Sequence, residues 1–175
     1  LAAKDEREFV IELAARQRRL AEPEAILRMS SEAIGRRLGV NRVGFYRVVG
    51  NDRIRHSGAW TDGSLLPLIG LQPTDTFGGF AEAERRAGRM VIFADARTDA
   101  EGQLGAYAAD GVLAGLCVPL MDEGRWVAGI YLHQGEVRLW SGGEISLAQE
   151  LTLQTWLAME RAEALLRLGQ RVDRQ

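Results

Sequence analysis

The chain has 175 residues, of which 46% are hydrophobic and 26% are charged, a composition typical of one globular domain with a well-filled core. Its formal net charge of −2 gives no electrostatic reason to expect a nucleic acid or an anionic membrane as a partner. A single cysteine excludes an internal disulfide, a multi-cysteine zinc site and a two-cysteine redox cycle within the chain.

Signals that would direct the chain to a membrane are missing from the sequence. It contains no apolar run long enough to span a bilayer and no pattern of a signal peptide. We therefore expect a cytoplasmic protein. Because the chain begins with Leu1 rather than methionine, we interpret it as a piece of a longer protein.

Two helices are predicted at the start of the chain. The first covers residues 4–20, where apolar residues recur at helical spacing. Pro23 suits the first turn of a second helix, and Gly39 suits its left-handed end. The apolar face of this second helix consists of Ile26, Leu27, Ser30, Ala33, Ile34 and Leu38.

Two strands and an irregular segment are predicted next. The strands cover residues 43–49 and 53–60, on either side of a polar turn. The segment from Thr61 to Asp75 has no regular pattern and contains several glycines and prolines. It is the best candidate for a functional loop.

Three short elements are predicted after this loop. A helix is expected over residues 77–88, a strand over 90–95 and another helix over 102–111. Short polar side chains that can cap helices precede both helices: Thr74, Asp75 or Thr76 for the first, and Thr98 or Asp99 for the second. We expect Asp75 and Asp95 to cap turns rather than to act as acids.

A β-hairpin over residues 112–135 is the clearest element of the sequence. Its strands are joined by Asp122-Glu123-Gly124, with glycine where a three-residue loop needs a left-handed residue. If Met121 opposes Arg125, side-chain alternation sorts the strands into two faces. One face is aliphatic and includes Trp126, whereas the other collects glycines, Cys117, Tyr131 and His133. We expect helices to cover the first face and a lined pocket to cover the second.

A long helix is predicted at the end of the chain. Ser141 and Glu144 form a capping box at its start, and the pattern runs to about Leu168. The order of elements, with short hairpins and helices at both ends, predicts an α+β fold with a largely antiparallel sheet.

This order of elements and several of its segments resemble a GAF domain of the phytochrome-like kind found in bacterial sensor histidine kinases. The resemblance runs from about Glu24 to Ala162 and is carried by ILRMSSEAIGRRLGVNRVGFYRV, AWTDGS, DTFGGF, RAGRMVIFADART, YAADGVLAGLCVPLMDEGRWVAGIYLHQ and RLWSGGEISLAQELTLQTWLAMERA. It implies a six-stranded antiparallel sheet with the terminal helices on one face and a pocket with short helices and loops on the other. It also implies a non-catalytic sensory module of a two-component signalling protein.

The resemblance also suggests a division of the chain. Residues 1–21 would form a linker helix, residues 22–160 the GAF domain, and residues 161–175 a signalling extension toward a downstream kinase or other output domain. The ligand is an unknown small molecule, and no cofactor or metal is assigned.

Aromatic and polar side chains are the candidates for lining the pocket. His133 looks like the histidine that contacts the chromophore in phytochrome-type relatives, and the irregular loop would form the lid. The competing interpretation is a filled core, with His133 bonded to a loop carbonyl. The predicted ligand-binding residues are Trp60, Phe77, Phe80, Tyr107, Cys117, Tyr131 and His133.

More specific functions of relatives find less support in the sequence. The alternative function is a bilin photosensor, but Gly102 and Gln103 stand where the Cys-His pair of one phytochrome family would attach the chromophore. The methionine sulfoxide reductases on this fold need several cysteines, which makes an enzyme less favoured. The signature of cyclic-nucleotide-binding relatives is missing. His56 lies beside arginines and is expected to be exposed.

The final helix carries two apolar stripes. One stripe, which includes Ala148 and Met159, is expected to face the sheet. The other follows near-heptad spacing and is expected to form a homodimer, the alternative being that both stripes pack within one chain. The predicted interface residues are Leu147, Leu151, Ala158, Ala162 and Leu165.

Overall fold

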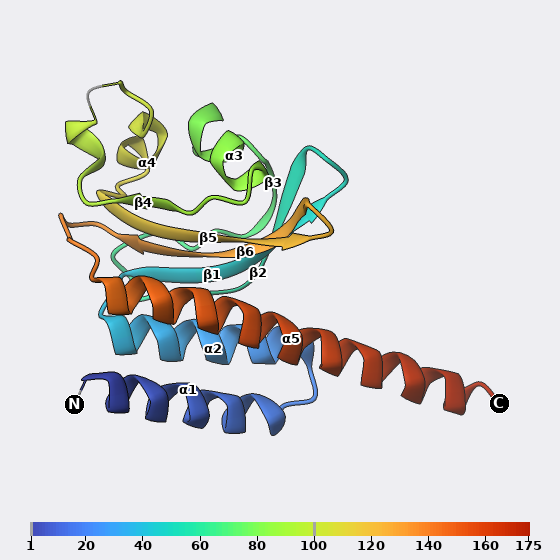
Figure 1. Cartoon of the computed structure of the whole chain (residues 1–175). Helices are drawn as coiled ribbons and strands as arrows, with labels where there is room; N and C mark the ends of the chain where they lie inside the picture. Colours follow the sequence, from blue (N-terminus) through green and yellow to red (C-terminus); the bar gives the residue numbers. More distant parts are fainter. Residues whose placement is uncertain (1, 100) are drawn as a thin grey trace.

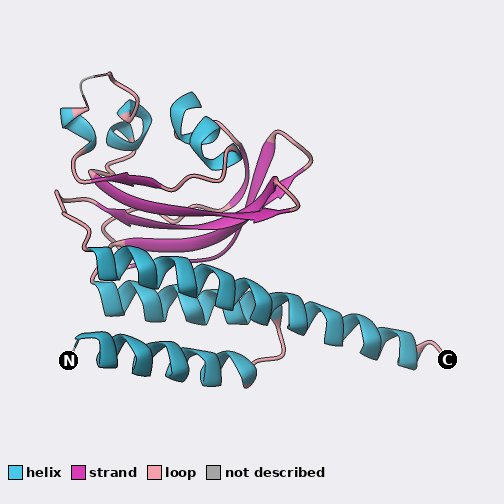
Figure 2. Ribbon diagram, viewed as in Figure 1, coloured by secondary structure: helices cyan, strands magenta, loops and turns pink. Residues whose placement is uncertain are grey.

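The computed structural model describes residues 2–99 and 101–175 and has three layers (Figures 1 and 2). A six-stranded sheet lies between the long terminal helices on one face and short helices with loops on the other. Helices α1 (Ala2–Arg18), α2 (Pro23–Leu38) and α5 (Gly142–Asp173) form the first layer. Helices α3 (Gly79–Arg86) and α4 (Gly105–Ala109) and the 3-10 turn η1 (Ala96–Thr98) form the third.

The sheet is antiparallel throughout, in the order β3-β2-β1-β6-β5-β4. This confirms the predicted α+β fold class with its six strands and two covered faces. The strands are β1 (Arg42–Val49), β2 (Arg53–Thr61), β3 (Gly70–Pro73), β4 (Val91–Phe93), β5 (Ala114–Asp122) and β6 (Arg125–Gln134).

Strand β3 lies within the segment predicted to be an irregular loop. It has four residues, begins at Gly70 with φ +74° and ends at Pro73. Glycine and proline are both disfavoured inside strands. Proline is tolerated in an edge strand, because the backbone N–H that it lacks would point to solvent there and would make no hydrogen bond of the sheet. The strand therefore forms because β2 offers it a free edge.

Glycines and polar caps fix several element boundaries as the sequence predicts. Gly39, Gly88 and Gly111 each follow a helix with positive φ, at +66°, +79° and +82°. The capping box of Ser141 and Glu144 is formed at the start of α5. The expected caps of α3 are wrong, because Gly78 occupies its N-cap position and no side chain bonds there.

The central hairpin has a two-residue turn rather than the predicted three-residue loop. Glu123 and Gly124 both have positive φ, at 50° and 77°, as a type I′ turn requires. A bulge between Leu120 and Met121 then shifts the register by one more residue. Together the two changes move the pairing by two residues, so each residue beyond the bulge keeps its predicted face.

Because of the bulge, the prediction that Trp126 lies on the aliphatic face of the hairpin is wrong. Between the turn and the bulge the alternation is reversed, and Trp126 opposes Met121 and packs on the pocket face. The aliphatic face itself packs against the terminal helices as expected, through Leu116, Val118, Ile130 and Leu132.

Three of the predicted dimer residues, Leu147, Leu151 and Ala162, are buried in the single chain. Leu147 and Leu151 are buried on the helix side of the sheet, where Val10 and Leu13 of α1 pack in the same cluster. The prediction that these two leucines form an interface is wrong, because α1 covers the second stripe along the first half of α5. The C-terminal part of α5 continues beyond α1 and α2 (Figure 1).

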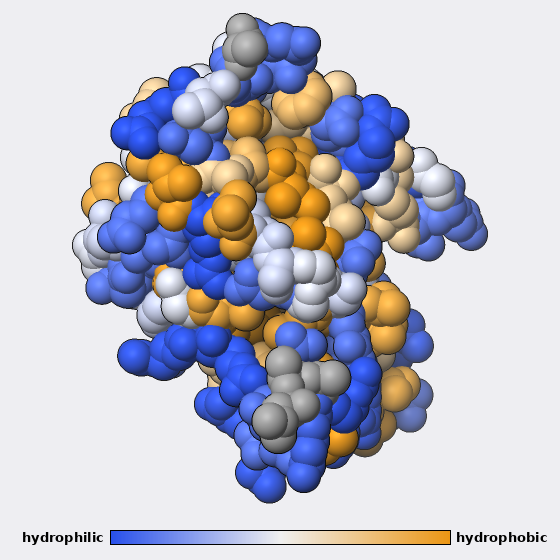
Figure 3. All heavy atoms as spheres, turned by 60° about the vertical axis from the view of Figure 1, so that its left-hand side comes forward, coloured by the Kyte–Doolittle hydropathy of each residue, from blue (hydrophilic) through white to orange (hydrophobic). Residues whose placement is uncertain are grey.

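The face of the molecule in Figure 3 has apolar patches between hydrophilic groups. Several large apolar side chains of the connecting segments are exposed. The most exposed large apolar side chains of these segments are Leu66, Ile69 and Leu139. Among the described residues, no helix has the length and hydropathy that crossing a bilayer requires.

Candidate functional site

The pocket face of the sheet carries aromatic rings opposite glycines. Tyr131 on β6 pairs with Gly44 on β1, and a Cβ at Gly44 would lie only 2.1 Å from the Tyr131 hydroxyl. Glycine therefore allows the ring to lie over the neighbouring strand, which a side chain at position 44 would prevent. Two more directly opposed pairs repeat this arrangement: Tyr46 with Gly129 and Phe93 with Gly115.

His133 is oriented by a fully buried arginine. Arg42, at the start of β1, approaches His133 Nδ1 with its Nε at 3.2 Å and its Nη2 at 2.8 Å. Nη2 also donates to Asp110 at 2.7 Å, and Nη1 donates to the carbonyl of Leu66 at 2.6 Å. Since arginine can only donate, His133 Nδ1 accepts, and the hydrogen of the neutral ring is on Nε2.

Both histidines of the chain are neutral at pH 7. Burial, reinforced by the charge of Arg42, lowers the pKa of His133 well below its usual range. Burial also lowers the pKa of His56 to about 4. The ring nitrogens therefore act as single donors or acceptors rather than as charged groups.

Three buried polar atoms of this pocket have no hydrogen-bond partner within the described part of the chain. They are Nε2 of His133, the hydroxyl of Tyr131 and Nδ1 of His56. Their rings are neighbours, with 4.7 Å between the centroids of Tyr131 and His133 and 5.7 Å between those of His56 and Tyr131. Because an unpaired buried polar atom costs about 1–3 kcal/mol, this cluster requires an explanation.

His56 is part of the pocket, which corrects the prediction that it is exposed. It lies half-buried on β2, and its Nε2 bonds Oε1 of Gln72 at 3.1 Å. Gln72 belongs to β3, the strand that the sequence did not predict. The covering strand, rather than any property of the histidine, accounts for its burial.

The third layer closes the pocket from above. Phe77, which precedes α3, stacks on Tyr107 of α4 with 4.6 Å between ring centroids. The cavity left between these rings and the sheet has a volume of about 10 Å³, room for about one water molecule. The pocket is therefore closed in this conformation, and a larger ligand can enter only if the segment that carries Phe77 moves away from the sheet.

A second buried arginine, Arg85 of α3, also lines the cavity. Its Nε donates to the carbonyl of Ala81 at 3.2 Å and its Nη2 to that of Thr74 at 3.3 Å. Its guanidinium carbon lies 5.0 Å from the ring centre of Trp126. All these neighbours are uncharged, so the positive charge of Arg85 has no carboxylate against it among the described residues.

Five of the seven predicted ligand-binding residues lie together around the cavity: Phe77, Tyr107, Cys117, Tyr131 and His133. Trp60 does not. It packs on the helix side of the sheet over Gly35 of α2. Phe80 is part of α3 but points outward and is 37% exposed. Whether the five residues bind a ligand stays a prediction.

The sequence reasoning missed Arg85, Tyr46 and His56 as pocket residues, and Arg42 as the residue that orients His133. Two signals could have indicated them. Arg42 directly precedes an apolar strand, and Tyr46 and His56 have the parity of the pocket face. Arg85 gave no signal, because an arginine within a short polar helix is usually solvated.

The described residues of this pocket do not favour nucleophilic catalysis or metal binding. Burial raises the pKa of the Cys117 thiol, so the nucleophilic thiolate is disfavoured. Asp95 accepts from the backbone N–H of Arg97, as the expected turn cap does. Across residues 2–99 and 101–175, no three His, Cys, Asp or Glu side chains gather as a metal site would require.

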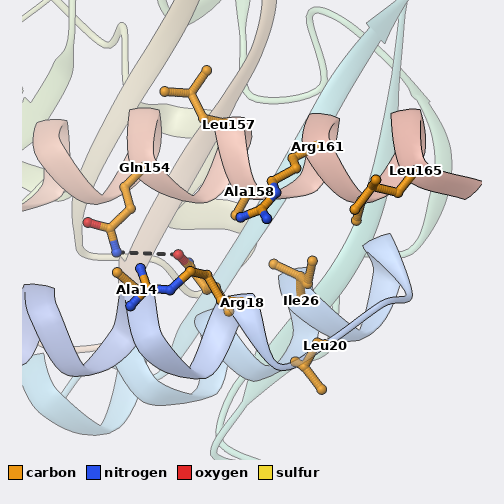
Figure 4. A pocket seen from close by; sticks show the side chains of 11 residues that line it. Ala14, Arg18, Leu20, Ile26, Gln154, Leu157, Ala158, Arg161 and Leu165 are labelled. Carbon is orange, nitrogen blue, oxygen red and sulfur yellow. Dashed lines mark hydrogen bonds between the residues drawn. The ribbon is translucent and has the colours of Figure 1, made fainter.

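A second hollow lies between the terminal helices (Figure 4). Its volume is about 280 Å³, and α1, α2 and α5 all contribute to it. Three of the predicted interface residues, Ala158, Ala162 and Leu165, line this groove together with Leu157. Figure 4 shows Leu165 on α5 pointing toward Ile26 across the opening, whereas the side chain of Leu157 points away from Leu20 and Ile26.

The fold and the pocket define a class of protein, an α+β domain with a small aromatic pocket on one face of a six-stranded antiparallel sheet. The GAF domain family matches residues 22–159, which is most of the chain. The chain therefore belongs to the GAF domain family. No curated protein sequence matches it.

Solved structures of low identity share this fold. The phycoerythrobilin-bound GAF domain of a cyanobacterial phytochrome has a TM-score of 0.76 at 17% identity, covering 91% of this chain and 96% of that one. The free methionine-R-sulfoxide reductase of Neisseria meningitidis, in complex with its substrate, has a TM-score of 0.72 at 14% identity, covering 94% of both chains. The GAF domain of the Acinetobacter phosphoenolpyruvate-protein phosphotransferase has a TM-score of 0.70 at 13% identity, covering 90% and 93%. Such identities demonstrate a common fold and do not transfer a ligand.

Proposed function

We propose that this chain is a non-catalytic sensory domain of a cytoplasmic multidomain signalling protein, a histidine kinase by the sequence resemblance. It binds a small molecule in the cavity bounded by His56, Tyr131 and His133. The observation that carries this proposal is the group of three buried, unpartnered polar atoms in one aromatic pocket. A bound ligand supplies the missing partners and recovers the free energy that the empty pocket forgoes.

The experiment is native mass spectrometry of the chain as purified, followed by denaturation of the same sample. A mass difference that disappears on denaturation identifies a non-covalent ligand. The matched control is Tyr131→Phe, which removes one unpartnered hydroxyl and should reduce the occupied fraction. An unchanged mass in the presence of cell extract and of candidate metabolites would contradict the proposal.

Bilin binding is the second candidate, because the neighbouring fold with a TM-score of 0.76 holds a bilin. Two features of this chain weigh against it: a cavity of about 10 Å³, and Gly102 with Gln103 at the family's attachment position. A visible absorption spectrum after coexpression with bilin synthesis separates the two functions. A red-region band, with zinc fluorescence after a denaturing gel, would favour the photosensor.

An enzyme on this fold is the least favoured alternative. Multiple-turnover reduction of methionine sulfoxide would require a second thiol to complete the cycle, and the chain has one cysteine. Measurable turnover in the presence of a thiol reductant would contradict the sensory proposal.

We also propose that the terminal helices relay the signal through a homodimer. Residues 1–21 act as a linker, residues 22–160 as the sensory domain, and residues 161–175 as an extension toward the output domain. The groove of Figure 4 and the exposed leucines of α5 support this arrangement. Leu157 and Leu165 replace Leu147 and Leu151 as the leucines of the interface.

A further inference from the structure

We propose that the cavity binds a small anion, to which His133 Nε2 and the Tyr131 hydroxyl donate while Arg85 supplies the opposite charge. This inference rests on the proposed sensory function and names the chemical class of its ligand. Inorganic anions and small carboxylates share this chemistry, and the probes below separate them.

Arg42, which lies outside the cavity, determines which nitrogen of His133 carries the hydrogen. Arg42 occupies Nδ1 of His133, which leaves Nε2–H as the only polar group that this ring turns toward the aromatic side. Burial raises the pKa of Tyr131, so its hydroxyl keeps its hydrogen. Two neighbouring donors with no acceptor are complementary to a ligand atom that carries lone pairs.

The charges around the cavity do not balance. Arg42 and Arg85 are both buried, and among the carboxylates that the structure describes only Asp110 is paired with either of them. The two carboxylates nearest to Arg85 in the chain have other partners: Glu84 is paired with Arg89, and Glu82 bonds Arg86 and Thr74. One buried positive charge is therefore left over in the described part of the pocket, and an anion would neutralise it.

His56 contributes a group of adjustable polarity. Because its Nε2 faces Oε1 of Gln72, its unpartnered Nδ1 is an acceptor. Rotation of the Gln72 amide by half a turn presents NH₂ to Nε2 and moves the ring hydrogen to Nδ1. The ring then offers a third donor to the anion without taking up a proton.

The size of the cavity limits the anion. About 10 Å³ admits a species of the size of water or chloride as the pocket stands. A larger anion must displace Phe77, which lies directly before Gly78 with φ +97° and Gly79. We therefore expect affinity to fall as the anion grows from chloride and formate to acetate.

The test uses the two histidines of the chain as probes. Long-range ¹H–¹⁵N spectra of histidine rings report the tautomer and the environment of each nitrogen. Sodium chloride, nitrate, formate and acetate are titrated separately, with ionic strength held constant by a bulky sulfonate that exceeds the cavity. The expected result is a saturable shift of His133 Nε2 with at least one of these anions.

Variants distinguish a specific site from general attraction of anions. Arg85→Gln should weaken binding by about 10-fold or more, and Tyr131→Phe by a few-fold. Arg86→Gln is the matched control, because it removes the same charge from the next position of α3, where Arg86 is partly exposed and paired with Glu82. It should leave the affinity unchanged. Amide spectra check the folding of each variant.

The outcomes separate the anion from the sensory function. No saturable shift with any probe, or equal losses in Arg85→Gln and Arg86→Gln, would overturn the anion site. A neutral molecule found by native mass spectrometry would overturn it while leaving the sensory function intact. Should Arg85→Gln not fold, Arg85→Lys must retain binding and Tyr131→Phe must reduce it, and any other result contradicts the proposal.

Discussion

The hydroxyl groups of Tyr46 and Tyr131 lie on the same face of the sheet but have different partners. Tyr46 accepts a hydrogen bond from Trp126 Nε1 at 3.2 Å, whereas the Tyr131 hydroxyl has no partner among the described residues. A buried polar group without a partner lowers stability, and such groups persist where function requires them. The pair therefore permits a direct comparison of a structural and a functional hydroxyl.

We expect opposite effects when each hydroxyl is removed from the ligand-free protein. Tyr46→Phe should lower the free energy of unfolding by about 1–3 kcal/mol, because it leaves the Trp126 N–H unpaired. Tyr131→Phe should leave it unchanged or raise it by up to about 1 kcal/mol. Urea denaturation of both variants measures the difference. A loss at Tyr131 equal to that at Tyr46 would indicate a structural partner for this hydroxyl.

The neutral histidines predict a decline of stability in mild acid. The unfolded chain binds protons at each histidine below about pH 6.5. The folded chain does not do so until about pH 4 for His56, and burial also lowers the pKa of His133 well below its usual range. Since the unfolded state then holds more protons, the free energy of unfolding falls as the pH decreases from 6.5.

For His56 this decline should amount to about 1.5 kcal/mol between pH 6.5 and 5. His56→Gln should remove its share of the slope in this window, where carboxylates contribute little. Urea denaturation of the native chain and the variant at several pH values measures both slopes. Identical slopes would show that His56 is accessible to protons in the folded state.

At the scale of elements, the central hairpin has a turn that its sequence does not optimise. Glu123 has φ 50°, a conformation that costs most residues free energy but suits asparagine. Glu123→Asn should therefore raise the free energy of unfolding by about 0.5–1 kcal/mol. Gly124→Ala, at φ +77° with open space around a Cβ, should lower it by a similar amount or more. Thermal denaturation of the two variants tests the turn type, and equal effects would contradict it.

Helix α5 serves two environments along its length. Leu151 is fully buried against the sheet and α1, whereas Leu157 and Leu165 are 54% and 58% exposed. One side of α5 therefore belongs to the domain core as far as Ala162, whereas Leu157 and Leu165 leave apolar side chains in water. Burying a leucine side chain contributes about 1.5–3 kcal/mol, which favours a partner for these two leucines.

At the scale of the whole molecule, the exposure of Leu157 and Leu165 predicts a dimer that can be dissociated without unfolding the domain. Leu157→Glu with Leu165→Glu should give a folded monomer at protein concentrations of tens of micromolar (about 50 μM), where the native chain is a dimer. Size-exclusion chromatography with light scattering measures both masses. A native chain that is monomeric at that concentration would contradict the dimer.

Leu151→Ala is the matched control for this experiment. It should lower the free energy of unfolding by about 2–5 kcal/mol through the cavity it leaves. Because Leu151 lies in the core, the mass of the folded species should not change. A monomeric Leu151→Ala variant that remains folded would place this residue at the interface after all.

The sequence by itself determined the local features of this protein. Residue parity placed Cys117, Tyr131 and His133 on one face and Leu116 with its neighbours on the other, since side chains alternate whatever the partner strand. Glycines ended helices where a positive φ was needed, and the capping box began α5, because these are short-range steric and hydrogen-bonding effects.

Only the tertiary structure decided which elements lie against each other. Periodicity shows that a face is apolar, but it does not show what covers it, so Trp60 and Leu151 were assigned to the wrong surroundings. The same limit applies to the charged residues of the pocket. Arg85 and His56 resemble solvated residues in the sequence. Arg85 becomes buried where α3 packs against Trp126 of the sheet, and His56 where the unpredicted strand β3 covers it, because burial depends on segments distant along the chain.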